Sequence, residues 1–201
     1  MNPSFNLPST RCALALKEWS VAVAALERGR QILLIRKGGL LDAEGSFQVE
    51  AARFFLSPTK WHQNANLLKP AHHDLLESDA SPQRGVLHLT AWAEVAQVWS
   101  LDARDEYIEE KLMQLQHIWS TRYLDVRLNY QSDKPVQVLA LRVHVLQVPH
   151  EVESRPEYSG CKSWIELESA LELSPSTPAL DDEIFERELN QARRVLEDGK
   201  C

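Results

Sequence analysis

The residues best suited to chemistry lie in two turn-forming segments within the first third of the chain. Arg36-Lys37-Gly38-Gly39 follows an apolar run, and His62-Gln63 comes shortly after Ser57-Pro58-Thr59. Glycines that expose backbone N–H groups beside fixed cations are typical of nests that bind anions. The first segment therefore predicts a site for a phosphate-like anion, and the second supplies a general base or a hydrogen-bonding pair.

Each of these features also has a purely structural interpretation. Arg36 and Lys37 can be two solvated cations before a tight turn, because the segment lacks Walker or dinucleotide spacing. His62 can be a loop histidine bonded to backbone. Further along, strand alternation places Arg142 and His144 on one face. There they can line a pocket with Arg36 or pair with surface acids, and the pattern leaves both open.

The sequence does not indicate a metal centre or a nuclease site. His72-His73-Asp74 has ligand-type side chains, but adjacent residues point apart on a strand and about 100° apart on a helix. A metal-dependent nuclease needs an acid pair and a lysine at strand positions. Glu50 lies on an expected strand, but neither Arg53 nor Lys60 has the expected spacing from it. Cys161 fits a packed turn cysteine better than a nucleophile.

Composition describes an ordinary globular protein rather than a membrane or disulfide-rich one. The chain has 201 residues, of which 44% are hydrophobic and 25% charged, enough for one domain with its own core. No apolar run approaches the roughly 20 residues that span a bilayer, and the N-terminus does not resemble a secretory signal. Cys12, Cys161 and Cys201 are far apart and odd in number, which favours the reducing cytoplasm.

Charge is distributed unevenly along the chain. The net charge is −7, but residues 1–75 hold nine Lys/Arg against six Asp/Glu, and residues 76–201 hold thirteen against twenty-three. The acidic excess disfavours non-specific adhesion of the whole chain to nucleic acid or anionic membranes. A local basic patch in the N-terminal half stays compatible with phosphate binding, since that depends on local charge.

Six tryptophans are many for this length, and they divide into two groups. Trp19, Trp99 and Trp119 fit apolar stripes of expected elements and are assigned to the core. Trp61 and Trp92 fit less well, so they are candidate stacking platforms for a base or a partner, with simple packing as the alternative.

Periodicity predicts an α+β domain with a mixed sheet covered by helices. The strands are expected at 31–37, 47–56, 86–99 and 136–148. The helices are expected at 13–28, where alternation also keeps a strand open, and from 103 to about 128, where continuity is undecided. The stretch 164–173 is a short strand or helix, 174–178 reads as a linker, and 180–197 is a charged helix.

Five segments of the chain resemble a known family in identity and in order. They are LKEW at 16–19, ILLIRKGG at 32–39, SPT-x-x-HQ at 57–63, KPVQVLALRVH at 134–144 and YSGCKSWIEL at 158–167. Together they resemble the bacterial, notably cyanobacterial, proteins grouped as domain of unknown function 1802, over roughly Cys12 to Leu173. Some relatives are linked with restriction-endonuclease-like domains, so the resemblance implies a nucleic-acid context.

These observations give one expected domain organisation and three functional hypotheses. A flexible arm at 1–12 precedes a single α+β domain at 13–173, and a linker with the charged helix follows at 174–201. The first hypothesis is a module that binds a phosphate-bearing ligand or nucleic acid through Arg36–Gly39, His62, Gln63 and Arg142. The second is a metal-dependent phosphodiesterase that uses His62 and Glu50, and the third a protein-interaction subunit. The sequence identifies no cofactor and no oligomeric state.

Overall fold

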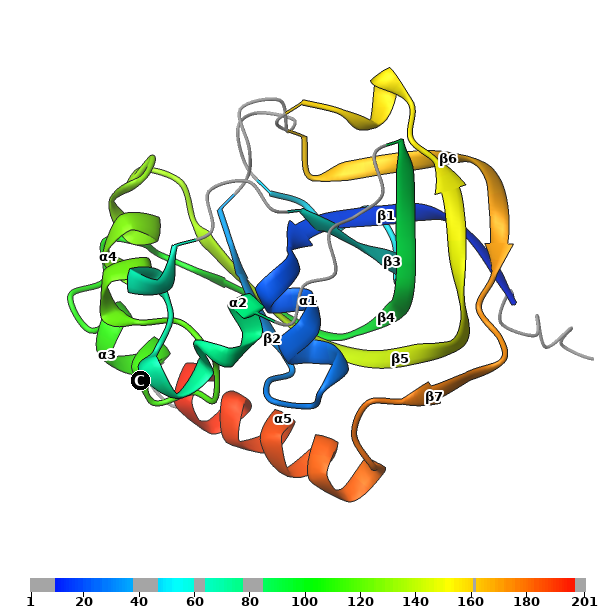
Figure 1. The fold of residues 1–201 in the computed structure, drawn as a ribbon. Coiled ribbons are helices and arrows are strands. Elements are labelled where there is room, and N and C mark those ends of the chain that lie inside the picture. Colours follow the sequence, from blue (N-terminus) through cyan, green and yellow to red (C-terminus); the bar gives the residue numbers. More distant parts are fainter. Residues whose placement is uncertain (1–9, 38–46, 60–63, 78–84, 161, 198–201) are drawn as a thin grey trace, which may run out of the picture.

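The computed structural model describes residues 10–37, 47–59, 64–77, 85–160 and 162–197. Within these residues seven strands form one mixed sheet, and helices gather on one side of it (Figure 1), which confirms the predicted α+β class. The strands are β1 (Arg11–Trp19), β2 (Leu33–Arg36), β3 (Arg53–Thr59), β4 (Val86–Leu101), β5 (Val136–Glu153), β6 (Trp164–Glu172) and β7 (Ser176–Pro178). The α-helices are α1 (Ser20–Glu27), α2 (Asp74–Glu77), α3 (Ile108–Met113), α4 (Thr121–Asn129) and α5 (Asp182–Glu197).

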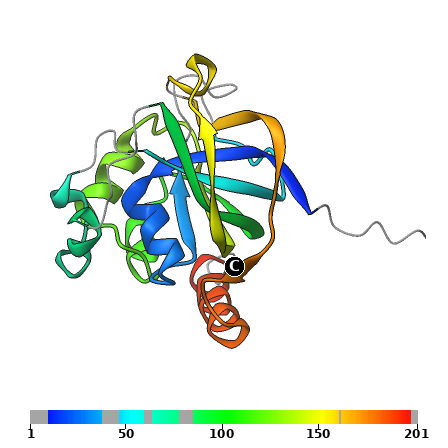
Figure 2. The same cartoon turned by 45° about the vertical axis from the view of Figure 1, so that its right-hand side comes forward.

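The sheet curls so that its two ends meet. Its strand order is β2-β5-β4-β3-β1-β6, with β7 paired to β5. Although β2 and β1 lie toward opposite ends of this order, Arg36 at the end of β2 hydrogen-bonds Glu18 of β1 and Ser163 just before β6. The curl can be followed in Figures 1 and 2. It brings the carboxyl end of β2 to the carboxyl end of β1.

Both faces of the central strands are buried. On β1, Ala15 and Leu16 are neighbours that point to opposite faces, and each has no exposed surface. Leu16 belongs to the large core beneath the helices, whereas Ala15 belongs to a smaller core on the other face. Phe54 and Phe55 divide in the same way on β3. These strands therefore show continuous apolar runs instead of clean alternation.

The predicted helix at 13–28 is wrong in its first half. Residues 11–19 form β1, and helix begins at Ser20. β1 pairs with β3 in parallel and with β6 antiparallel, so backbone pairing on both sides outweighs the helix propensity of its alanines. The parallel pairing also places Trp19 opposite Thr59 at one edge of the sheet.

The strand expected at 47–56 is displaced toward the C-terminus. β3 begins at Arg53 and continues through Pro58 to Thr59, so Pro58 does not end it. β4 pairs with β3 at Arg53–Phe55, whereas β1 pairs with it as far as Thr59. Near Pro58 the strand has a partner on one side, where a missing N–H can be accommodated.

The helix expected from 103 to about 128 is two shorter helices, α3 and α4. Between them Trp119 forms an isolated bridge with Leu68, and Ser120 begins α4 by accepting a hydrogen bond from the N–H of Tyr123. Ser120 is one of the residues favoured at helix N-termini. The break turns α4 toward the end of β2, where the hydroxyl of Tyr123 donates to the Ile35 carbonyl.

The C-terminal part mostly follows the prediction. The strands expected at 86–99 and 136–148 are present and longer, the stretch at 164–173 is strand β6, and the charged helix is α5. The expected linker at 174–178 contains β7, which pairs with β5. α5 packs on the core through Phe185, Leu189, Ala192 and Leu196. None of the helices within the described ranges has the length and apolar character needed to cross a membrane.

Candidate functional site

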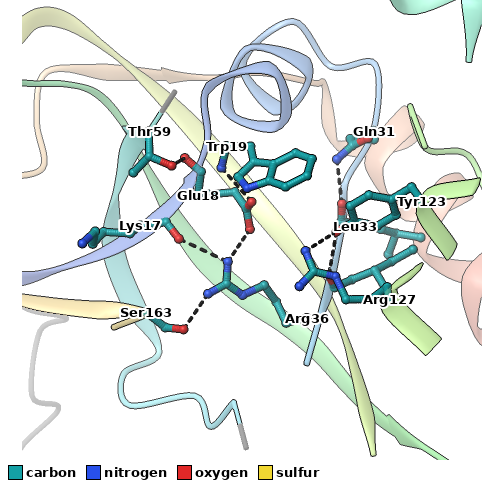
Figure 3. Close-up of polar contacts among 11 residues, drawn as sticks. Lys17, Glu18, Trp19, Gln31, Leu33, Arg36, Thr59, Tyr123, Arg127 and Ser163 are labelled. Atoms are coloured by element: carbon teal, nitrogen blue, oxygen red, sulfur yellow. Dashed lines mark hydrogen bonds and ion pairs between the residues drawn. The ribbon is translucent and has the colours of Figure 1, made fainter. Parts of the chain in front are cut away.

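A polar cluster occupies the place where the curled sheet closes (Figure 3). Lys17 and Glu18 come from the end of β1, Thr59 from the end of β3 and Arg36 from the end of β2. Ser163 precedes β6. Since β1 and β3 are parallel, their carboxyl ends share one edge, and the curl adds β2 to it. Segments far apart in sequence thus converge on one group of side chains.

Arg36 is the centre of this cluster. Its Nη1 donates to Glu18 Oε2 at 2.8 Å and to the Lys17 carbonyl at 3.2 Å, and its Nη2 donates to Ser163 Oγ at 2.6 Å. The guanidinium also lies over the Phe47 ring, 4.9 Å from its centroid. Such multiple donation uses the fork geometry of arginine and fixes the side chain in one orientation.

The ion pair of Arg36 is largely shielded from water. The side chain of Arg36 is 14% exposed and that of Glu18 is 5% exposed. The second carboxylate oxygen, Oε1, accepts from the Trp19 N–H at 2.7 Å. A buried pair is tolerable when further hydrogen bonds satisfy both partners, and here both carboxylate oxygens have donors.

Lys17 ties the neighbouring turn to the cluster. Its Nζ donates to the carbonyl of Tyr158 at 2.9 Å and to that of Gly160 at 2.7 Å. Its backbone N–H donates to the Ser163 carbonyl at 2.8 Å. The chain leading into β6 is therefore held by β1, which keeps the Ser163 hydroxyl within reach of Arg36.

An aromatic group adjoins the ion pair. The Trp119 and Tyr123 rings stack at 3.9 Å and 9°, and the Trp19 ring meets both edge-to-face at 5.5 and 5.7 Å. Trp119 and Tyr123 are buried, whereas Trp19 is half-buried. Burial raises the pKa of the Tyr123 phenol, so its hydroxyl stays neutral and donates to the Ile35 carbonyl at 3.2 Å.

Arg127 of α4 is a second guanidinium beside this group. Its Nη2 donates to the Tyr123 hydroxyl at 3.0 Å, and its Cζ lies 5.0 Å from the Tyr123 ring centroid. Within the described ranges no carboxylate lies at salt-bridge distance from it. Buried Gln31 helps to place α4, because its amide accepts from the Ile118 N–H and donates to the Leu33 carbonyl. Arg127 is thus a half-buried cation held by a neutral hydroxyl.

Counted over the side chains that the structure describes, the cluster carries a positive excess. Lys17, Arg36 and Arg127 contribute three cations, and Glu18 contributes one carboxylate. The Glu18 carboxylate is bound to Arg36, and its charge also favours the charged form of Arg127, so one acid faces both guanidinium groups. Two guanidinium groups next to hydroxyls are well suited to bind an oxyanion such as phosphate.

The side chains of two other predicted site residues, Lys37 and Arg142, make their hydrogen bonds outside the polar cluster around Arg36. The ammonium of Lys37 is buried and donates to the Leu128 carbonyl at 2.7 Å, and burial lowers its pKa. Arg142 lies elsewhere, over Phe185, and is bonded to Asp182 of α5. Of the two interpretations left open for Arg142, the structure shows the pairing with a surface acid.

Four residues expected in the site fall outside the described ranges: Gly38, Gly39, His62 and Gln63. The same holds for Trp61 and Cys161. Trp92, the other suggested platform, is 7% exposed and stacks on His144 at 4.1 Å, so it is packed.

The described residues do not support the metal site or the nuclease site considered from the sequence. Asp74 of the His72-His73-Asp74 run accepts two hydrogen bonds from Arg30, each at 2.7 Å. Over the ranges that the structure describes, no three His, Cys, Asp or Glu side chains are grouped to hold a metal ion. Glu50 is exposed and precedes β3.

Sequence reasoning missed six members of the cluster and its aromatic group: Lys17, Glu18, Thr59, Ser163, Tyr123 and Arg127. A signal for four of them was present, because four of the five segments that resemble the family reach this place. LKEW supplies Lys17 and Glu18, ILLIRKGG supplies Arg36, SPT-x-x-HQ supplies Thr59, and YSGCKSWIEL supplies Ser163. No comparable signal marked the two α4 residues.

Comparison with known families now identifies the chain. A family model described as Domain of unknown function (DUF1802) matches residues 15–191. The chain is a member of the DUF1802 family. The match confirms the resemblance and contains every side chain of the polar cluster.

Two solved structures are similar to this DUF1802 chain. A serine-to-alanine variant of the ASCH protein from Zymomonas mobilis is 8% identical, with a TM-score of 0.46, and the alignment covers 88% of this chain and 94% of that one. The unsubstituted ASCH protein from the same organism is 10% identical, with a TM-score of 0.43, covering 88% and 93%. No curated protein matches the chain.

Proposed function

We propose that this DUF1802 domain binds a phosphate-bearing ligand at the cluster of Lys17, Arg36, Arg127 and Ser163. The ligand's oxyanion contacts the Arg127 guanidinium, and the Arg36–Glu18 pair fixes the edge of the site. The proposal keeps the location predicted from Arg36 and adds α4, which the sequence did not indicate.

The observation that carries this proposal is the environment of Arg127. An arginine stays charged in any protein environment, so partial burial must be compensated by a partner. The Tyr123 hydroxyl at 3.0 Å is neutral, and no carboxylate within the described ranges pairs with Arg127. An oxyanion would supply the missing negative charge through charge-assisted hydrogen bonds.

The surroundings of Arg127 support an anion rather than a cation as ligand. Glu18, the acid in the cluster, has both oxygens occupied, by Arg36 and by the Trp19 N–H. Burial keeps the Tyr123 hydroxyl protonated, so it adds no negative charge. An entering anion therefore meets two arginines and no free carboxylate among these side chains.

The test compares two arginines of the same helix. Inorganic pyrophosphate is titrated into the wild-type protein and into Arg127→Gln and Arg122→Gln, with the melting temperature as readout. Arg122 is exposed on α4 and serves as the matched control. A ligand that binds the native state raises the melting temperature in proportion to RT ln(1 + [L]/Kd).

We expect pyrophosphate to raise the melting temperature of the wild type and of Arg122→Gln, and to leave Arg127→Gln unchanged. The stabilisation should weaken as salt is added, because charged groups near the surface are screened. Equal shifts in all three proteins, or no shift in the wild type, would overturn the proposal.

A further inference from the structure

The aromatic group beside the cluster has one member with accessible surface. Trp119 is 1% exposed and Tyr123 is 4% exposed, whereas Trp19 is half-buried. The Trp19 ring stands at 80° to both of the other rings, so two edge-to-face contacts fix its plane. The two contacts thus hold the indole in one orientation, and Trp19 keeps part of its surface accessible.

This surface is joined directly to the charged part of the site. Trp19 follows Glu18 in the chain, and its N–H is bound by the same carboxylate that pairs with Arg36. Figure 3 shows the Trp19 indole above the Arg36–Glu18 pair, with Tyr123 and Arg127 coming from α4. Across the sheet, Trp19 is in register with Thr59. A ligand bound to either arginine would have a flat apolar surface next to it.

We propose that the ligand is a nucleoside phosphate whose phosphate contacts Arg127 and whose base packs against Trp19. The inference rests on the proposed function and specifies its ligand class. Base stacking on an aromatic side chain tolerates every base, because each base has a π-face. An inorganic phosphate or a phosphorylated side chain would leave the Trp19 surface unused. The nucleoside phosphate can be a free nucleotide or one unit of a single strand.

The experiment separates stacking from phosphate binding. Pyrophosphate, adenosine monophosphate, uridine monophosphate and a short single-stranded RNA are titrated into the wild type, Trp19→Leu, Trp19→Phe and Trp99→Phe. Trp99 is the matched control, since its indole N–H donates to Glu197 of α5, away from the cluster. Affinities are measured by calorimetry well below the melting temperature of each variant.

We expect Trp19→Leu to weaken binding of the nucleotides or the RNA by on the order of tenfold, the loss of one stacking interaction. Its pyrophosphate affinity should match the wild type, Trp19→Phe should recover much of the loss, and Trp99→Phe should bind normally. Binding of a monophosphate identifies a free nucleotide as a sufficient ligand. Binding of the RNA alone, with a steep salt dependence, identifies a single strand.

Unchanged nucleotide and RNA affinities in Trp19→Leu would overturn the inference. Pyrophosphate binding with no gain from any nucleoside would also overturn it and would leave the proposed function standing. Failure of every probe, pyrophosphate included, would overturn both. If Trp19→Leu does not fold, tryptophan fluorescence of the wild type and of Trp19→Phe is measured instead. Quenching of the wild type by a nucleotide but not by pyrophosphate, and its loss in Trp19→Phe, would support stacking on Trp19. Equal quenching in both proteins, or none in the wild type, would overturn the inference.

Discussion

Arg36 and Arg142 occupy closely matched settings in two regions of the molecule. Their side chains are 14% and 15% exposed. Each guanidinium lies over a phenylalanine, at 4.9 Å from the centroid of Phe47 and 4.8 Å from that of Phe185. Each also donates to a backbone carbonyl and to one carboxylate.

The carboxylates make the difference between the two regions. Glu18, the partner of Arg36, is 5% exposed, whereas Asp182, the partner of Arg142, is 96% exposed. An exposed carboxylate is well solvated whether or not it is paired, so pairing adds little. A buried carboxylate that loses its partner cannot recover that solvation. Burial of the acid, rather than of the arginine, should therefore decide how strongly each pair constrains the fold.

The largest expected effect comes from removing the buried charge. Glu18→Gln should lower the free energy of unfolding by on the order of 3 kcal/mol, because an amide cannot neutralise Arg36 and its NH₂ group conflicts with the guanidinium donors. Urea denaturation measures this loss.

The matched control for that substitution is Glu94→Gln. Glu94 pairs with Arg53 at 3.2 Å across β3 and β4, and its side chain is 42% exposed. Its loss should be several times smaller. Equal losses from the two glutamines would show that burial of the acid is not what distinguishes the pairs.

The comparison also explains what the sequence could predict. The long strands at 86–99 and 136–148 were predictable because alternation is a local signal, and a strand end near Arg36 was predictable because an apolar run before a basic, glycine-rich turn is local too. Glu18 and Arg127 could not be placed, since their positions relative to Arg36 depend on the curl of the whole sheet. Glu18 was also assigned to a helix, because the alanines around it mask a strand that is paired on both sides.

For Arg142 the sequence predicted the strand on which it lies but not the helix that packs over it. Alternation placed Arg142 and His144 on one face, and the structure confirms that both lie on β5. What covers Arg142 is the beginning of α5, which lies about forty residues further along the chain. A pattern within one strand contains no information on which distant element packs against it.

A third buried group sharpens the comparison, because no acid among the described residues pairs with it and it stays neutral instead. His117 is 2% exposed, its Nε2–H donates to the Leu112 carbonyl at 2.9 Å, and its Nδ1 accepts from the Trp119 N–H at 3.1 Å. Burial, with a smaller contribution from the charge of Lys69, lowers the pKa of His117 from 6.5 to about 4.

Acidification should therefore destabilise the protein through His117. Between pH 6.5 and pH 4 the unfolded chain binds a proton at this residue and the native state does not, so stability falls as pH falls and then levels off. The loss should be on the order of 3 kcal/mol. His117→Gln should remove this slope from urea denaturation series, while His73→Gln, at an exposed histidine, should keep it. An unchanged slope in His117→Gln would contradict the assignment.

Replacing each arginine by lysine tests the geometry of the pairs. Arg36→Lys keeps the charge but cannot bond Glu18, the Lys17 carbonyl and Ser163 together, so it should cost about 1–2 kcal/mol. Arg142→Lys gives up a bond to the Asp181 carbonyl and an exposed acid, and should cost less. Thermal melting curves compare them. A greater loss of stability from Arg142→Lys would contradict this expectation and would show that stacking on Phe185 stabilises the fold more than the buried acid partner of Arg36 does.

The smallest expected effect completes the comparison. Asp182→Asn should leave the melting temperature unchanged within error, both in the wild type and in an Arg142→Gln background, since the exposed carboxylate is well solvated with or without its partner. The equivalent double-mutant cycle for Glu18 and Arg36 should give a clear coupling energy, because both partners lose solvation there. If the two cycles gave equal coupling, the shared features would have to explain it. The shared features are the phenylalanine beneath each guanidinium and the backbone carbonyl beside it. The burial of Glu18 would then be a consequence of the closure of the sheet and would not be what stabilises that closure.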